Sequence, residues 1–187
     1  MAGGQWVSKR AGRRVAIAAL ALALAFGPVP VLAQRSSPDA LKAEVVYRLM
    51  MFVAWPAERE TPERGLQICT LGDGSVDNAL QGLSGRPIRQ LTVVARRLPR
   101  PEQFAGCHLL YVAGPQPALR AALADAPVLL VSDAAGMLDQ GAMINLQVED
   151  GRIVFDVELD AARRAGLVIS TKLLRLARFV RHQAATP

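Results

Sequence analysis

The pattern of apolar and polar positions predicts an alternation of helices and strands along most of the chain. After Ser37 and Pro38, which suit the start of a helix, apolar residues recur at helical spacing as far as Val53. Pro56 ends this helix, because the residue before a proline avoids the helical region. Short apolar runs predict strands at residues 66–73, 88–98, 107–114 and 127–136, and helices at residues 76–83 and 116–126 separate them.

The order of these elements defines the expected fold class. Strands that alternate with helices are joined by right-handed crossovers, so the sheet is mainly parallel and helices cover both of its faces. From residue 143 the pattern changes to strict alternation on both sides of Asp150-Gly151, which is typical of a β-hairpin. A brief helix at residues 160–167 and a closing helix at residues 170–183 follow. We therefore expect an α/β sandwich, doubly wound and Rossmann-like, with an antiparallel hairpin at one edge of the sheet.

Three carboxylates occupy alternate positions near the end of the hairpin, at Asp156, Glu158 and Asp160. The positions that alternate with them are apolar, namely Ile153, Phe155, Val157 and Leu159. This pattern is typical of a strand with one buried face, so we expect the acids on the solvent side and Asp160 also as the cap of the next helix. A catalytic pair needs one carboxylate whose pKa is shifted by burial or by a close like charge. Solvated acids lack that difference, so a structural role is expected.

Residues 1–33 have the order of a secretory signal peptide. A basic segment precedes the apolar run at residues 15–26, and Val31 and Ala33 stand where a signal peptidase reads small residues. The alternative, a retained membrane anchor, would need an apolar run of about 20 residues. We therefore expect an exported protein, periplasmic or secreted, whose mature residues 34–187 form a single domain.

Removal of the leader changes the electrostatic interpretation of the chain. Its four basic residues are lost, so 22 Lys and Arg become 18 against 16 Asp and Glu, and the formal net charge falls from +6 to +2. No strongly basic field remains to attract a polyanion. The composition therefore excludes nucleic acid as the expected partner.

Cys69 and Cys107 are the only cysteines of the chain. In an exported protein such a pair is expected to form a disulfide. Each cysteine lies in or at the start of a predicted strand, and a doubly wound strand order 2-1-3 would make these two strands neighbours. The alternative is a pair of buried free thiols.

The other motifs give no sign of a metal, a cofactor or a catalytic centre. Gly72 and Gly74 follow a strand and fit a G-x-G pattern, but Asp77 stands at the third glycine position. Its charge would repel a pyrophosphate, so a tight turn is the better interpretation. His108 and His182 lack the spacing of a zinc site, and neither has the context of a base beside a cysteine nucleophile.

The predicted closing helix has two distinct sides. The apolar side consists of Leu173, Leu176, Ala177 and Val180. The basic side consists of Lys172, Arg175, Arg178 and Arg181. Either the helix is docked with a solvated basic face, or this face contacts an acidic partner surface or anionic lipid head groups. Phe52 and Trp55, at the end of the first helix, leave the same choice between core packing and a binding surface.

Several stretches together resemble the YfiR/HmsC family of small exported bacterial proteins. They are MFVAWP, ICTLGDG, CHLLYV, PVLLVSD, GAMINLQVEDGRIVFDVELDAARRAGL and STKLLRLAR. They run in order from Leu41 to Val180, nearly the whole mature chain, and the last two are the most specific. The family pattern has an aromatic residue and Trp-Pro at a helix end, then a Gly-Met-Ile-Asn strand and a Leu-Asp-Ala-Ala-Arg-Arg-Ala-Gly turn.

The resemblance implies a regulatory protein rather than an enzyme. Proteins similar to YfiR bind the periplasmic sensory portion of an inner-membrane diguanylate cyclase and hold it inactive, which restrains cyclic-di-GMP output and biofilm formation. Cys69 and Cys107 align with the core disulfide of the family, but a second cysteine pair is missing, so a redox role of that pair does not transfer. Met51 stands where relatives often place lysine. Some family domains act beside histidine kinases, which makes a sensor kinase an alternative partner.

Two functional hypotheses follow from these observations. The first is a periplasmic inhibitor of a membrane diguanylate cyclase or sensor kinase, with a homodimer as a further option. Its contact residues are expected to be Phe52, Trp55, Lys172, Arg175 and Arg178. The second is a periplasmic small-ligand sensor or carrier, with a cleft at the carboxyl ends of the strands near Gly72, Asp73, Gly114 and Asp133. An enzyme is the weakest hypothesis, because the sequence offers no nucleophile, base or cofactor constellation.

Overall fold

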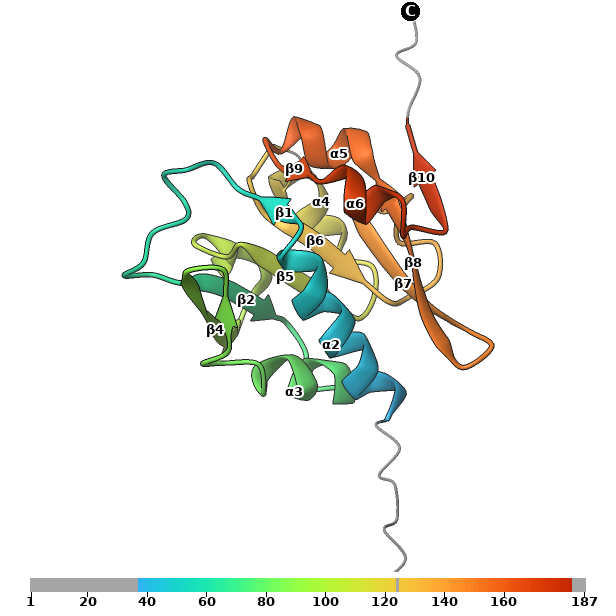
Figure 1. Cartoon of the computed structure of the whole chain (residues 1–187), viewed down its shortest axis with the longest axis horizontal. Helices are drawn as coiled ribbons and strands as arrows, with labels where there is room; N and C mark the ends of the chain where they lie inside the picture. The colour runs from blue at the N-terminus through green and yellow to red at the C-terminus, as the bar shows by residue number, and fades with distance from the viewer. Residues whose placement is uncertain (1–36, 124, 183–187) are drawn as a thin grey trace, which may run out of the picture. The chain divides into compact units, whose positions relative to one another are not determined.

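The computed structural model describes residues 37–123 and 125–182, and Figure 1 shows how their helices and strands are arranged. The predicted signal peptide, residues 1–33, lies outside the described residues. Within the part of the chain that is described, no helix is long and apolar enough to cross a membrane.

The centre of the structure is a mixed sheet with the strand order β10-β8-β7-β6-β5-β2-β4-β3. Its strands are β2 (Leu66–Thr70), β3 (Pro87–Ile88), β4 (Leu91–Arg97), β5 (Leu109–Val112), β6 (Leu129–Ser132), β7 (Ile144–Glu149), β8 (Arg152–Glu158) and β10 (Phe179–Arg181). Neighbouring strands from β4 through β2, β5 and β6 to β7 are parallel, whereas β3 pairs antiparallel with β4 and β8 antiparallel with β7. The predicted fold class is confirmed. A separate antiparallel pair joins β1 (Val53–Ala54) to β9 (Val168–Ile169).

Helices cover both faces of this sheet. They are α2 (Pro38–Met50), α3 (Ser75–Gln81), α4 (Pro117–Leu123), α5 (Leu159–Arg164) and α6 (Thr171–Leu174), with a short 3-10 helix η1 (Pro101–Phe104). In Figure 1, α2 crosses in front of the sheet and α4 lies behind it. Successive side chains of a strand point to opposite faces, so Leu109 of β5 joins the core under α2 and Leu110 joins the core under α4. Burial on both sides explains why β5 and β6 are uninterrupted apolar runs.

The start of α2 follows the expected chemistry. The hydroxyl of Ser37 accepts a hydrogen bond from the backbone N–H of Ala40 at 3.1 Å, and Pro38 occupies the first helical turn. The helix ends at Met50, before the predicted limit at Pro56, because β1 begins at Val53.

The β7–β8 hairpin is present where the sequence predicts it. Asp150 and Gly151 have φ angles of 49° and 73°, the left-handed pair that a two-residue turn of type I′ requires. The hairpin is followed by one more strand that the sequence analysis did not identify. β10 lies outside β8 and pairs with it in parallel, so β10 forms this edge of the sheet.

The predicted closing helix at residues 170–183 is wrong. Only Thr171–Leu174 form α6, which is capped by the hydroxyl of Ser170, and β10 follows after a turn. The backbone N–H of Arg178 donates to the carbonyl of Phe155 at 2.9 Å as the chain joins β8. The physical reason is that β8 would otherwise leave its outer row of backbone groups unpaired, and an added strand satisfies them whereas a helix would not.

The expectation that the acids of β8 face solvent is also wrong. Asp156 is 6% exposed and Glu158 is 2% exposed. The guanidinium of Arg178 binds both carboxylate oxygens of Asp156, at 2.9 and 2.5 Å, and Nε of Arg181 binds Glu158 at 2.6 Å. Asp160 is not the cap of α5, because Glu158 holds that position and makes no side-chain capping bond.

Replacement of Arg178 by alanine is expected to lower the free energy of unfolding by about 2 kcal/mol. The substitution leaves the buried carboxylate of Asp156 without its partner, and the partial exposure of Arg178 reduces the loss below that of a fully buried pair. The matched control is Arg175→Ala, an exposed residue of the same segment, for which a loss below about 0.5 kcal/mol is expected. Urea unfolding followed by circular dichroism measures both, and equal losses would contradict the role of the ion pair.

Candidate partner-binding surface

The residues predicted to contact a partner fall into two groups. Phe52 is half-buried, and Lys172 and Arg175 are exposed, so all three present side-chain surface to solvent. Trp55 is only 5% exposed, and the guanidinium of Arg178 is bound to a buried carboxylate. Trp55 and Arg178 therefore make contacts within the protein. The candidate contact surface is centred on Phe52, Lys172 and Arg175.

Backbone pairing places the end of α2 beside α6. β1 follows α2 directly and pairs with β9, with Val53 opposite Ile169. The backbone N–H of Ser170 then donates to the carbonyl of Phe52 at 2.9 Å. Because Ser170 also caps α6, this bond fixes the start of α6 next to Phe52.

A groove of about 370 Å³ lies between α2, β8 and α6. Its lining consists of Val45, Arg48, Leu49, Met51, Phe52, Ile153, Phe155, Leu173 and Leu176. Every one of these side chains except Arg48 is apolar. Such a lining suits the apolar side chains of a partner better than it suits a charged ligand.

A second and more open cavity, of about 440 Å³, adjoins the groove. It shares Met51 and Phe52 with the groove and extends to Val168 and Lys172, so Phe52 stands between the two hollows. Val168 and Leu176 are 66% and 68% exposed, so they add apolar area to the rims of these two hollows. The name Phe52 surface refers here to the cluster of Val45, Met51, Phe52, Val168, Leu173 and Leu176.

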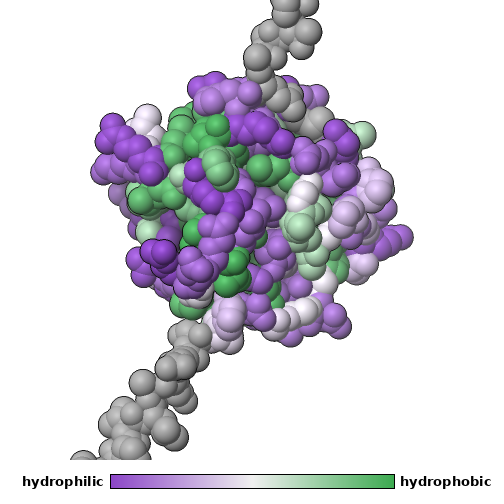
Figure 2. Space-filling model, turned by 90° about the vertical axis from the view of Figure 1, so that its right-hand side faces the viewer, coloured by the Kyte–Doolittle hydropathy of each residue, from purple (hydrophilic) through white to green (hydrophobic). Residues whose placement is uncertain are grey.

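Basic side chains border the Phe52 surface. Arg48 is paired with Glu44 at 3.1 Å, whereas Lys172 and Arg175 form no ion pair with any described residue. Figure 2 shows the side of the molecule that carries β8 and β10, where apolar side chains gather in patches among hydrophilic ones. Exposed charges at the rim of an interface mainly steer association and select partners. The arrangement fits a partner whose own contact surface is apolar with an acidic rim.

The sequence analysis missed Val168 as a part of the Phe52 surface and Ile153 as a part of the groove lining. Val168 lies between Leu167 and Ile169, both of which are buried. A run of three apolar residues in an extended segment must turn its middle member to the opposite side, and this is the signal that could have identified Val168. Ile153 was correctly assigned to the apolar side of β8. Its place in the groove lining could not be foreseen, because the sequence analysis predicted a longer helix where the short α6 lies.

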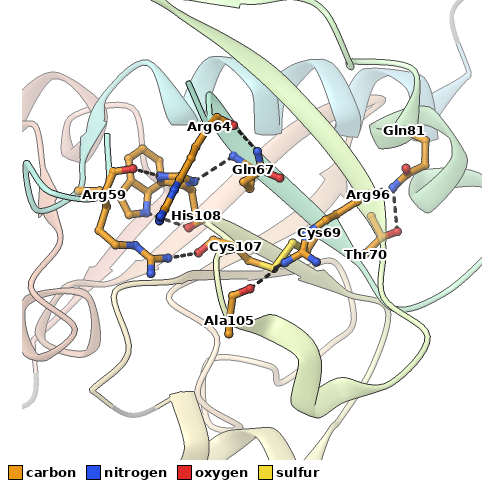
Figure 3. The surroundings of a disulfide bond; sticks show 11 residues. Arg59, Arg64, Gln67, Cys69, Thr70, Gln81, Arg96, Ala105, Cys107 and His108 are labelled. Carbon is orange, nitrogen blue, oxygen red and sulfur yellow. Dashed lines mark hydrogen bonds between the residues drawn. A yellow bond between two sulfur atoms is a disulfide. The ribbon is translucent and has the colours of Figure 1, made fainter. Parts of the chain in front are cut away.

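Trp55 is held in the interior by its contacts with His108 (Figure 3). The indole N–H of Trp55 donates to the carbonyl of His108 at 2.8 Å, and the two rings meet edge to face with centroids 5.6 Å apart. Nδ1 of His108 accepts from the backbone N–H of Gln67 at 2.9 Å, and Nε2 lies 2.8 Å from the carbonyl of Arg59, to which it donates. The neutral imidazole therefore satisfies both backbone groups, and burial lowers the pKa of His108 from its ordinary value of 6.5.

The structure contains the disulfide between Cys69 and Cys107 that the sequence predicts. The two Cα atoms are 5.9 Å apart, because β2 and β5 are parallel neighbours. Arg59 donates to the carbonyl of Cys107 at 2.6 Å and so ties the loop between β1 and β2 to the bridge. Both cysteines are fully buried in the core under α4. The bridge therefore links β2 to the start of β5 at a position that solvent does not reach.

Asp133 and Gly72, two residues of the predicted ligand cleft at the carboxyl ends of the strands, form internal hydrogen bonds. Asp133 binds Nζ of Lys42 at 2.6 Å and accepts from the hydroxyl of Tyr111 at 2.6 Å. The N–H of Gly72 donates to the buried carboxylate of Asp77, which gives the glycine loop the tight turn expected. Neither the groove nor the cavity beside it is lined by Gly72, Asp73, Gly114 or Asp133, and a ligand site there stays a prediction. Nor do residues 37–123 and 125–182 contain a cluster of His, Cys, Asp or Glu that could hold a metal ion.

The described residues form a small α/β domain with an apolar groove on its surface. Residues 39–178 match the YfiR/HmsC-like family, and the chain belongs to that family. Membership supports, in general terms, a periplasmic regulator of diguanylate cyclase rather than a catalyst.

Two solved structures are also similar to the chain. One is the ABC domain from Streptococcus pneumonia in complex with L-Trp, with a TM-score of 0.47 and 13% identity over 77% of this chain. The other is a conserved domain protein from Vibrio cholerae, with a TM-score of 0.45 and 11% identity over 78% of this chain. The chain spans 60% of the length of each of these two structures.

Removal of the disulfide by the double substitution Cys69→Ala and Cys107→Ala is expected to lower the free energy of unfolding by about 4 kcal/mol. The bridge closes a loop with a sequence separation of 38, and the loss follows from the conformational entropy that the unfolded chain regains. Urea unfolding of both proteins without reductant measures the difference. A change below about 1 kcal/mol would show that the bridge does not constrain the unfolded chain.

Substitution of His108 by alanine is expected to cost about 2 kcal/mol at about pH 7.5, because the N–H of Gln67 loses its acceptor. Since the pKa of His108 is lowered in the folded protein, the unfolded chain takes up the proton first. The contribution of His108 is thus complete above its unfolded pKa of 6.5 and declines as the pH falls toward the folded pKa. Unfolding at about pH 7.5 and about pH 5 should show a smaller difference between wild type and variant at the lower pH. A difference that does not change would contradict this assignment.

Proposed function

We propose that the protein is a periplasmic repressor of an inner-membrane diguanylate cyclase. It binds the periplasmic sensory domain of the cyclase through the Phe52 surface and thereby limits cyclic-di-GMP production and biofilm formation. One observation carries the proposal. A chain of the YfiR/HmsC-like family exposes a groove lined almost entirely by apolar side chains, beside two basic residues that have no partner among the described residues.

The apolar part of the Phe52 surface supplies the affinity. Leu176 and Val168 are mostly exposed in the free protein, and complete burial of such a side chain contributes about 1.5–3 kcal/mol. The floor of the groove, formed by Leu173 and Phe155, is already buried and so needs no ordering when a partner binds. A rigid, preformed hollow favours an anchor side chain from the partner, in the manner of interface hot spots.

The basic residues beside the Phe52 surface, Lys172 and Arg175, are expected to orient the partner and to raise the rate of association. Lys172 and Arg175 are exposed, so their charges act through solvent and are screened by salt. Charges of this kind accelerate encounter with an oppositely charged surface and disfavour incorrect partners. We therefore expect association with the sensory domain to slow as the ionic strength rises.

Repression by binding alone requires a preference between two states of the partner. The protein can shift the cyclase toward inactivity only to the extent that it binds the inactive state more tightly. A change from one part in a hundred inactive to ninety-nine in a hundred needs a preference of roughly ten-thousandfold, or about 5.5 kcal/mol. The apolar contacts of the Phe52 surface contribute to that preference only where they form in the inactive state and not in the active one.

A periplasmic domain of a sensor kinase is the alternative partner for the same surface. A homodimer that buries the Phe52 surface would also satisfy its exposed apolar side chains. The sensory domain of a cyclase, a domain of a sensor kinase and a second copy of this chain are thus three candidate occupants. Only the first makes the cyclic-di-GMP level depend directly on binding at the Phe52 surface.

Substitution of Leu176 or Val168 by aspartate is expected to weaken binding to the sensory domain by at least tenfold. Each change places a charge in the apolar contact at a position that is exposed in the free protein, so folding should be unaffected. The matched control is Val94→Asp, which alters an exposed valine of β4 at the other end of the sheet. Calorimetric titration with the isolated sensory domain of a membrane diguanylate cyclase encoded beside this protein measures the three affinities. Equal affinities for all three variants would contradict the assignment of the surface.

The same variants extend the test to the cell. Deletion of the gene should raise cyclic-di-GMP, and complementation with Val94→Asp, but not with Leu176→Asp, should lower it again. An unchanged cyclic-di-GMP level after deletion would contradict repression, while size-exclusion chromatography of Leu176→Asp would reveal whether the surface instead holds two copies together.

A further inference from the structure

A third cavity, of about 330 Å³, lies on the face of the sheet opposite the Phe52 surface. β8 separates the two sites, because Ile153 and Phe155 line the groove while Glu158, of the other parity, lines this cavity. Its lining consists of Arg120, Leu123, Leu130, Leu138, Asp139, Gly141, Met143, Glu158, Ala161, Arg164 and Arg181. The volume is at the small end of the range of roughly 300–1,000 Å³ that is usual for ligand pockets.

The floor of the cavity is apolar and rigid. Leu123, Leu130 and Met143 are each buried and come from α4, from β6 and from the segment before β7. The backbone N–H of Met143 donates to the carbonyl of Leu130 at 2.9 Å, which fixes two of these three side chains relative to one another. Such a floor offers contact to an aliphatic or aromatic group without any rearrangement.

The mouth of the cavity carries an excess of positive charge. Arg120 of α4 and Arg164 of α5 are exposed, and neither forms an ion pair with a described residue. Arg181 is already occupied, since it binds Glu158 at 2.6 Å and Asp139 at 2.7 Å. Two guanidinium groups therefore remain available to an anion, and their planar forks match the two oxygens of a carboxylate.

Glu158 supplies the most specific feature of the wall. Its side chain is 3% exposed, and while Oε2 accepts from Arg181, Oε1 is buried and accepts no hydrogen bond from any described residue. A buried acceptor without a hydrogen bond is unfavourable, more so when it is charged, so a donor brought by a ligand would recover that free energy. Within the described part of the chain only four buried side-chain atoms are left unpaired in this way, and Glu158 Oε1 belongs to a residue that lines this cavity.

We propose that this cavity binds a small amphipathic carboxylate that carries a hydroxyl group. The carboxylate would pair with Arg120 and Arg164, the apolar body would lie on the floor formed by Leu123, Leu130 and Met143, and the hydroxyl would donate to Oε1 of Glu158. The proposal does not depend on the partner of the Phe52 surface, because the two sites use different faces of the sheet.

The test uses three probes of related shape with the purified protein. They are 3-phenyllactate, which has all three features, 3-phenyllactamide, which lacks the charge, and 3-phenylpropionate, which lacks the hydroxyl. Two-dimensional NMR titration is expected to show saturable shifts of the amides of residues 120–123, 141–143 and 158–164 with 3-phenyllactate. Affinity at least tenfold weaker is expected for the amide, and weaker affinity is expected for the propionate. The absence of saturable shifts up to about 5 mM 3-phenyllactate, or equal binding of the three probes, would overturn the proposal.

Two substitutions on the same helix provide the matched comparison. Arg164→Gln removes one of the available guanidinium groups and should weaken 3-phenyllactate binding by at least tenfold. Arg163→Gln removes the neighbouring exposed arginine, which pairs with Asp160 and does not line the cavity, and should leave the affinity unchanged. Equal affinities for the two variants would overturn the assignment of the anion site, as would equally tight binding of inorganic phosphate alone.

Discussion

Two arginine–carboxylate pairs hold the C-terminal strand against the body of the protein, and both binding surfaces depend on them. Arg178 binds Asp156 and Arg181 binds Glu158, so each buried carboxylate is paired with a guanidinium group. Without those partners, two carboxylates would lie buried in β8 at a cost of several kcal/mol. The pairs dock β10, and because α6 immediately precedes β10, they also keep α6 beside the end of α2, where the Phe52 surface forms.

Because side chains alternate along β8, its apolar residues and its ion-paired acids lie on opposite faces of the sheet. Ile153 and Phe155 face α2 and complete the apolar groove, whereas Asp156 and Glu158 face the other way and receive the arginines. One strand thus lines the groove of the proposed protein contact on one side and the cavity of the proposed small-molecule site on the other. The disulfide lies farther along the sheet, between β2 and β5, and stabilises the frame without entering either site.

The sequence was sufficient for those features that local chemistry determines. Apolar periodicity gave the helices and strands of the doubly wound sheet, Asp150-Gly151 gave the hairpin, and the neighbouring positions of β2 and β5 in a 2-1-3 order gave the disulfide. It failed where the deciding contact lies far away along the chain. The acids of β8 were assigned to solvent because their partners, 22 and 23 residues later, belonged to a segment with convincing helical spacing. The ion pair of Asp133 could not be foreseen for the same reason, since its partner Lys42 comes from 91 residues earlier.

Hydrogen–deuterium exchange of the protein alone and in the presence of the cyclase's periplasmic sensory domain tests the central claim most directly. The account predicts slower exchange of residues 48–53 and 168–176, which carry the Phe52 surface, and no change in the tip of the β7–β8 hairpin. Protection of the hairpin or of α4, with residues 48–53 and 168–176 unaffected, would contradict it.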